Sequence, residues 1–239
     1  MQRPYITCHM VTSLDSKVTG DFLFRKECEK ATEVYYDINR SAKCNGFICG
    51  RTTMEESFTQ GYFPFIENLD EVVDRVDFIP DDLSGFYAVA FDTNGKLGWK
   101  SNRIVDDDPG YGGAQVFEVL SENVDGKYLF YLQKLQIPYI FAGETEIDVT
   151  LALHKLKTIY NMDSLLLEGG SEINGAFERA DAIDELSLVI APVVADKDSK
   201  PLFNDSVISD YELTKTDTQK RVILNGVLRK PSGMTENTV

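Results

Sequence analysis

The sequence has few residues that bind metals. It has two histidines, His9 and His154, and four cysteines without C-x-x-C spacing. The cysteines are Cys8, Cys28, Cys44 and Cys49. We therefore expect no metal site, and we interpret the cysteines as free thiols of a protein in a reducing cytoplasm.

Positive charge is also scarce. The 239 residues include 24 lysines and arginines against 39 aspartates and glutamates, which gives a net charge of −15. This charge repels nucleic acids and anionic membrane surfaces, so we expect neither as a partner. An anionic ligand would need a local pocket of backbone donors and a few basic side chains.

Long apolar runs are missing as well. No run is long enough to cross a bilayer, and the first residues lack the apolar stretch of a secretory signal, which again predicts a cytoplasmic protein. The hydrophobic content of 43% is ordinary for a globular protein, and no low-complexity linker divides the chain. We therefore expect one domain over residues 1–239.

What is present is an alternation of strand and helix patterns. Buried strands are predicted at 5–11, 46–49, 87–91, 137–143, 165–167 and 184–192. Amphipathic helices are predicted at 26–43 and after Asp148, which can cap the second of them. Residues 115–136 fit a helix or a strand equally well. The order predicts an α/β fold with a mainly parallel sheet flanked by helices.

The C-terminal part departs from this alternation. Residues 211–229 are typical of a β-hairpin, with a turn near Asn225-Gly226 or earlier. We therefore expect antiparallel strands at the C-terminal end of the sheet.

One stretch, 165–176, combines an apolar strand, two glycines and a helix start. Gly169 and Gly170 would place bare backbone at the carboxyl end of a parallel strand, just before free helix N–H groups. This arrangement can hold a phosphate-bearing ligand. The alternative is that the glycines form only a turn.

A second glycine also ends a strand. Gly50 is followed by Arg51, Thr52 and Thr53, which open a helix. Arg51 can make charge-assisted hydrogen bonds, and either threonine could cap the helix while facing a phosphate. The alternative is a capped helix with a surface arginine.

Polar residues follow the first strand. Asp15 and Lys17 share one side of an extended segment and could grip a polar substrate, or they could lie in a solvent-exposed turn. Three consecutive aspartates at 106–108 are interpreted as a solvated acidic loop.

Together these motifs resemble the dihydrofolate-reductase-like superfamily. The resemblance is carried by 12–17, 50–53, Glu168-Gly169-Gly170 and 182–192. Within that superfamily the chain is most similar to the C-terminal reductase domain of the bifunctional riboflavin-biosynthesis deaminase/reductase (RibD) and its stand-alone relatives.

The resemblance implies a dihydrofolate-reductase-like fold, NADPH as cofactor, a homodimer, and reduction of a phosphorylated substrate, a phosphoribosylamino-pyrimidine. It also implies a strained, cis-like peptide between the two glycines. The implied cofactor-binding residues are Gly50, Arg51, Thr52, Thr53, Gly169, Gly170, Ser171, Glu172 and Ile173. The implied catalytic and substrate-binding residues are Asp15, Lys17 and Glu168, with Arg40 as a further substrate contact.

The sequence departs from the family pattern on the substrate side. Ser16 replaces a glycine, the segment 22–25 replaces a tryptophan-isoleucine motif, and no aspartate-aspartate-proline motif follows the second strand. A reductase of another small heterocycle, such as a pterin, and a nucleotide-binding protein without catalysis are therefore alternatives. Asp92, at a strand end, would favour NADH over NADPH if it met the adenosine ribose.

Overall fold

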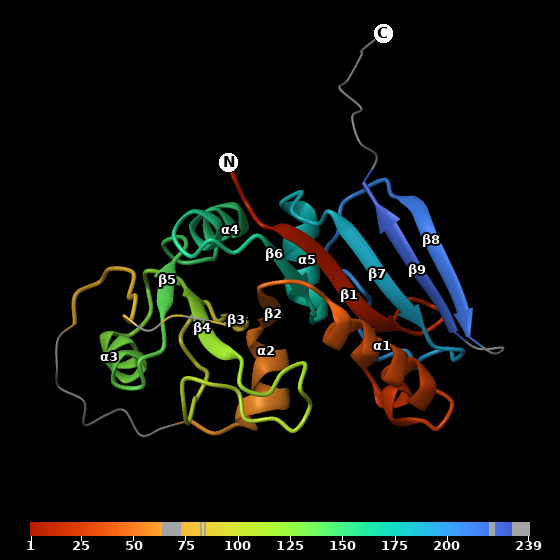
Figure 1. Cartoon of the computed structure of the whole chain (residues 1–239), viewed down its shortest axis with the longest axis horizontal. Coiled ribbons are helices and arrows are strands. Elements are labelled where there is room, and N and C mark those ends of the chain that lie inside the picture. Colours follow the sequence, from red (N-terminus) through yellow and green to blue (C-terminus); the bar gives the residue numbers. More distant parts are fainter. Residues whose placement is uncertain (64–72, 82, 84, 220–222, 231–239) are drawn as a thin grey trace, which may run out of the picture.

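A computed structural model describes residues 1–63, 73–81, 83, 85–219 and 223–230. One sheet of nine strands runs through these residues in the order β5-β4-β3-β2-β6-β1-β7-β9-β8 (Figure 1). The strands are β1 (Tyr5–Thr12), β2 (Gly46–Gly50), β3 (Tyr87–Phe91), β4 (Gln115–Leu120), β5 (Tyr139–Phe141), β6 (Ser164–Leu167), β7 (Glu185–Ile190), β8 (Glu212–Gln219) and β9 (Ile223–Arg229).

The helices are α1 (Glu29–Ser41), α2 (Arg51–Met54), α3 (Gly126–Lys134), α4 (Val149–Thr158) and α5 (Ser171–Arg179). A 3-10 turn covers Asp21–Phe24, and α2 continues as a π-helical turn over Glu55–Thr59. Within the described ranges, no helix has the length and apolar character needed to cross a bilayer.

The strand directions confirm the predicted fold class. Every pairing among β1 to β7 is parallel, whereas β9 pairs antiparallel with both β7 and β8. The sequence predicted a hairpin turn near Asn225-Gly226 or earlier, and the earlier alternative agrees with β8 ending at Gln219 and β9 beginning at Ile223. Asn225 and Gly226 themselves lie inside β9, opposite Val189 and Leu188. Pairing along the whole of β7 outweighs the local turn preference of an Asn-Gly pair.

Alternate residues of each strand face opposite layers of helices, as the period of two requires. Ile6 and Cys8 of β1 face a core that includes the apolar sides of α4 and α5. The other face packs against α3 through Phe47 and against α1 through Val11. Figure 1 shows α4 above the sheet and α1, α2 and α3 below it.

Capping residues define two of the helix starts. Asp148 accepts a hydrogen bond from the Leu151 N–H, which confirms the predicted cap of α4. The segment 115–136, which fitted a helix or a strand equally well, contains both: β4 comes first, and Asp125 then caps α3. Local sequence could not separate them because β4 is buried along its whole length and α3 buries the run 128–132, so neither shows a clear alternation of buried and exposed positions.

Phe177 anchors α5 to the sheet and should be a large contributor to stability. Its side chain is fully buried and contacts the Phe91 ring edge-on at 5.3 Å between centroids. Phe177→Ala should lower the free energy of unfolding by about 3 to 5 kcal/mol, because a buried ring is replaced by a cavity. Urea unfolding would measure this change. Phe24→Ala, at a side chain that is 89% exposed, is the control and should change it by less than about 0.5 kcal/mol.

Candidate functional site

The site lies where parallel strands end at the same edge of the sheet. The neighbouring strands β2 and β6 both end here: β2 ends in Gly50, and β6 leads into Glu168-Gly169-Gly170. The Gly50 N–H donates to the Gly169 carbonyl over 2.8 Å, and the Glu168 N–H donates to the Ile48 carbonyl over 2.9 Å. The two glycine stretches identified in the sequence are therefore held side by side.

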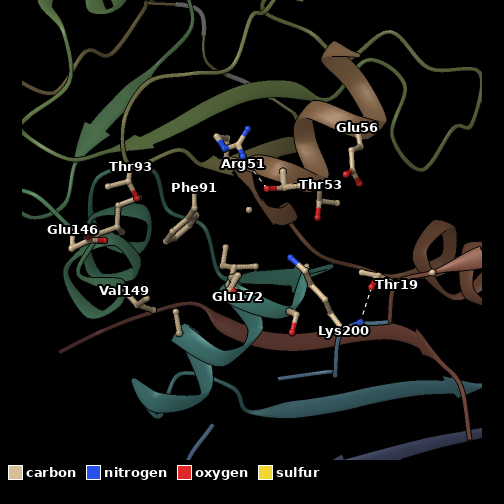
Figure 2. Close-up of a pocket in the computed structure, with 18 residues that line it drawn as sticks. Thr19, Arg51, Thr53, Glu56, Phe91, Thr93, Glu146, Val149, Glu172 and Lys200 are labelled. Carbon is tan, nitrogen blue, oxygen red and sulfur yellow. Dashed lines mark hydrogen bonds between the residues drawn. The ribbon is translucent and has the colours of Figure 1, made fainter. Parts of the chain in front are cut away.

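A cleft of about 650 Å³ opens between these strand ends, and we call it the glycine cleft (Figure 2). Eight of the nine predicted cofactor-binding residues line it: Gly50, Arg51, Thr52, Thr53, Gly170, Ser171, Glu172 and Ile173. Gly169 lies behind this wall, beside Met10. The sequence motifs thus converge on one cavity.

The backbone of the cleft leaves room for a ligand. The Gly169–Gly170 peptide is cis, as the resemblance implies. A Cβ atom at Gly170 would lie 3.4 Å from Thr53 Oγ1, and one at Gly50 would lie 3.5 Å from Ile173. Neither would collide with the protein itself, so a side chain there would occupy space that is otherwise open in the cleft.

The start of α5 offers hydrogen-bond donors to the cleft. The first N–H groups of a helix have no partner within it. Within the described part of the chain, the Oγ atom of Ser171 is buried and has no hydrogen-bond partner. Donors at a helix N-terminus suit an anionic group.

The residues at the start of α2 do not all act as the sequence predicted. Thr52 and Thr53 were expected to cap it, but both lie within α2, and Gly50 precedes the helix without a side-chain cap. Arg51 forms an ion pair with Glu55 one turn later, and its Nη2 atom donates to Thr52 Oγ1 over 3.1 Å. The guanidinium is therefore already engaged by its own helix.

Lys200 is a cleft residue that sequence reasoning missed. Figure 2 shows its side chain directed into the cleft, and among the described residues its Nζ atom has no hydrogen bond or ion pair. Its backbone N–H donates to Thr19 Oγ1 over 2.8 Å across 181 positions of sequence. A contact between residues so distant leaves no local pattern, so no sequence signal could have found it.

Asp15 and Lys17 do not line the cleft, whereas Thr19 and Gly20 of the same loop do. Asp15 accepts hydrogen bonds from the Ala195 N–H and the Ser13 hydroxyl, and these lower the pKa of its exposed carboxyl. Lys17 forms a backbone bridge with Pro201. These contacts join the loop after β1 to the segment 195–201.

A second cavity of about 360 Å³ adjoins the first, and Thr53 lines both. We call it the aromatic cleft. It is lined by Tyr35, Tyr36, Phe47, Cys49, Thr53, Ser57, Phe58, Asp106, Asp108, Tyr111 and Glu168. Glu168, a predicted catalytic residue, therefore lies here and not in the glycine cleft.

Glu168 is 6% exposed, and both of its carboxyl oxygens are hydrogen-bonded. Asn39 Nδ2 donates to Oε1 over 2.6 Å, and the Tyr111 hydroxyl donates to Oε2 over 3.0 Å. Burial raises the pKa of Glu168 to about 7, although hydrogen bonds from Asn39, Tyr111 and Tyr35 favour the ionised form. Neither Asn39 nor Tyr111 stood out in the sequence, since one lies on a helix face and the other in an acidic loop.

Two other residues singled out in the sequence, Arg40 and Asp92, bind other residues of the protein and line neither cleft. Arg40 lies outside both linings and forms ion pairs with Asp37 and Asp108. Asp92 is fully buried, accepts hydrogen bonds from the N–H groups of Lys96 and Leu97, and lines neither cleft. Its carboxyl closes a turn of its own loop.

Comparison with known proteins bears on the family and on the fold. Residues 115–227 match the family model of the RibD C-terminal domain. No curated protein matches the sequence.

Solved structures with the same fold cover 96% of this chain. Acinetobacter baumannii RibD has a TM-score of 0.66 at 19% identity, and the chain covers 58% of it. A pyrimidine reductase-like protein from Corynebacterium diphtheriae has a TM-score of 0.65 at 15% identity, with 93% of that protein covered. The riboflavin biosynthesis reductase Rib7 of Saccharomyces cerevisiae has a TM-score of 0.59 at 14% identity, with 90% covered. These likenesses confirm the fold, and this chain spans less than two thirds of the RibD structure.

Glu168 should make stability depend on pH. Its pKa rises from 4.5 to about 7 on folding, so the folded state binds the proton more tightly than the unfolded state. The resulting stabilisation is complete below about pH 4.5 and is lost as pH rises through about 7, a total of roughly 3 kcal/mol. In urea unfolding, the wild type should lose about 2 to 3 kcal/mol more than Glu168→Gln between about pH 5 and about pH 8.

Tyr111→Phe provides a second variant for this measurement. The Tyr111 hydroxyl stabilises the ionised carboxylate of Glu168. Its removal should therefore shift the pH-dependent loss of stability to higher pH. Equal pH profiles for the wild type and Glu168→Gln would contradict the raised pKa.

Proposed function

We propose that this chain, which carries a match to the RibD C-terminal domain over residues 115–227, is an NADPH-dependent reductase of a small nitrogen heterocycle. The family match and the likeness to solved reductases support a RibD-like reductase. The proposed reaction resembles that of 5-amino-6-(5-phosphoribosylamino)uracil reductase in riboflavin biosynthesis.

The adjacency of the two clefts is the observation that carries this proposal. The glycine cleft offers glycine backbone, a helix N-terminus and a lysine, while the aromatic cleft offers flat walls and a buried carboxyl. Thr53 lines both. A hydride donor in one cleft and an acceptor ring in the other would meet at this residue, and such positioning of reactants lowers the barrier.

The residues of the glycine cleft fit NADPH. The N–H groups at the start of α5, the unpartnered Ser171 hydroxyl and the Lys200 ammonium are suited to phosphate groups. Open space over Gly50 and Gly170 admits the cofactor close to the backbone. When bound, NADPH supplies the hydride.

Glu168 is the residue that we assign to the acceptor ring. With a pKa of about 7, its carboxyl exists in both protonation states near neutral pH, so it can accept a hydrogen bond from a ring N–H or release a proton. Asn39 and Tyr111 fix its orientation. The substrate contacts of Asp15, Lys17 and Arg40 stay predictions, because none of the three lines either cleft.

Turnover separates this function from a nucleotide-binding protein without catalysis. A reductase should oxidise NADPH in the presence of a suitable aminopyrimidine or pterin, which the loss of absorbance at about 340 nm would record. A binding protein should be stabilised by NADPH without oxidising it. The homodimer and the cytoplasmic location also carry over as parts of this proposal.

Gly170→Val should remove cofactor binding without unfolding the protein. Its backbone has a negative φ of −80°, which valine tolerates, but the added side chain would occupy the cleft beside Thr53. We expect NADPH affinity to fall at least about tenfold, the equivalent of 1.4 kcal/mol, in isothermal titration calorimetry. Gly126→Val, at a helix start with open space around it, is the control. Unchanged affinity in Gly170→Val would mean that the glycine pair is only a turn.

Lys200→Met should weaken NADPH binding by about tenfold or more, because a charge-assisted hydrogen bond to phosphate is lost. The loss should shrink at high salt, which screens the wild-type attraction. Lys197→Met removes the same charge from an exposed position of the same loop that lies outside the cleft lining, and it should leave affinity unchanged. Equal effects of the two substitutions would show that Lys200 acts only through the net charge of the protein and not through a direct contact with the phosphate.

A further inference from the structure

The aromatic cleft has an unusual charge distribution for a site expected to take a phosphorylated substrate. Asp106, Asp108 and Glu168 all line it, and its lining includes no lysine or arginine among the residues that the structure describes. Within the Debye length of about 8 Å at physiological ionic strength, such carboxylates repel a phosphate strongly.

Arg40, which pairs with the cleft residue Asp108, has its charge compensated. Its Nη1 atom lies 2.6 Å from Asp108 Oδ2, and its Nη2 atom lies 2.8 Å from Asp37 Oδ1. The guanidinium also rests over the Tyr36 ring, with Cζ 5.9 Å from the centroid. Two carboxylates already hold this single cation, so the surroundings of the aromatic cleft keep a negative balance.

The walls of the cleft suit a flat, uncharged ring. Tyr111 meets Phe47 edge-on at 5.1 Å between centroids and approaches Phe58 at 5.8 Å. Tyr35 and Tyr36 line the cleft as well. Aromatic surfaces of this kind pack against planar ligands and exclude water.

Glu168 gives the cleft a polar end with spare acceptor capacity. Asn39 donates to one oxygen and Tyr111 to the other, and Tyr35 is a further hydrogen-bond partner, whereas a carboxylate has about four acceptor sites. Because the carboxyl lines the cleft, the remaining sites can receive N–H groups from a ligand. The phosphorylated compound offers the same N–H groups, but its phosphate adds negative charge to a cleft that Asp106 and Asp108 also line.

We infer that the aromatic cleft binds an uncharged, planar nitrogen heterocycle through ring or amino N–H groups that donate to Glu168, and that it discriminates against the phosphorylated form. This inference rests on the proposed reductase function and specifies its substrate class. It differs from the phosphorylated substrate that the family resemblance implies.

The test compares 5-amino-6-(ribosylamino)uracil with its 5′-phosphate as ligands of the full chain, by isothermal titration calorimetry without NADPH. We expect the unphosphorylated compound to bind at least about tenfold more tightly. Equal or tighter binding of the phosphate would overturn the inference, and so would binding of neither compound. Glu168→Gln should weaken the unphosphorylated compound, because the amide offers fewer acceptor sites than the carboxylate.

Two neighbouring aspartates supply a matched pair of variants. Asp108→Asn removes a charge from the cleft and releases Arg40, while its side-chain oxygen can still accept from the Gly110 N–H. It should reduce the preference to about threefold or less by improving phosphate binding. Asp107→Asn, an exposed residue of the same loop outside the lining, removes the same charge and should keep the tenfold preference.

The design separates this inference from the proposed function. Binding of the unphosphorylated ring without any NADPH binding or oxidation would refute the reductase and leave the ligand preference standing. Binding and oxidation of NADPH together with tighter binding of the 5′-phosphate would support the reductase and refute the ligand preference. An unchanged preference in Asp108→Asn would show that charge in the cleft does not set the selectivity.

Discussion

The hydrogen bond between the Gly50 amide and the Gly169 carbonyl fixes the arrangement on which both clefts depend. It extends the parallel pairing of β2 with β6 beyond the ends of the two strands. A shift of one residue in this register would turn every side chain of β6 to the opposite face. Glu168 would then leave the aromatic cleft.

The central place of β6 follows from the connections of the chain. β1 passes through α1 to β2, and β6 is inserted later between these two strands. As a result, α1 stands near the end of β6, where its Asn39 reaches Glu168. The ring of Tyr35, also on α1, stacks on His9 of β1 at 4.4 Å between centroids, which fixes this helix over the sheet. The buried acid therefore depends on packing between three separate parts of the sequence.

The chain distributes its few cations unevenly. Arg51 and Lys200 line the glycine cleft, whereas the described lining of the aromatic cleft contains only acidic and uncharged side chains. With a net charge of −15, a basic side chain close to a phosphate has to act at short range. Glu56, Glu146 and Glu172 also line the glycine cleft, so the two clefts differ in their cations and not in their number of carboxylates.

Local patterns in the sequence determined most element types and the mainly parallel sheet, because strand period and helix caps act over a few residues, but they did not separate β4 from α3 within 115–136. The same patterns pointed to Glu168 only through the family resemblance. Tertiary structure alone decided that Lys200 enters the glycine cleft, that Tyr111 holds Glu168 and that Asp108 engages Arg40. Each of these contacts joins residues far apart in sequence, and a side chain acquires its partner, its burial and its pKa only when the chain has folded around it.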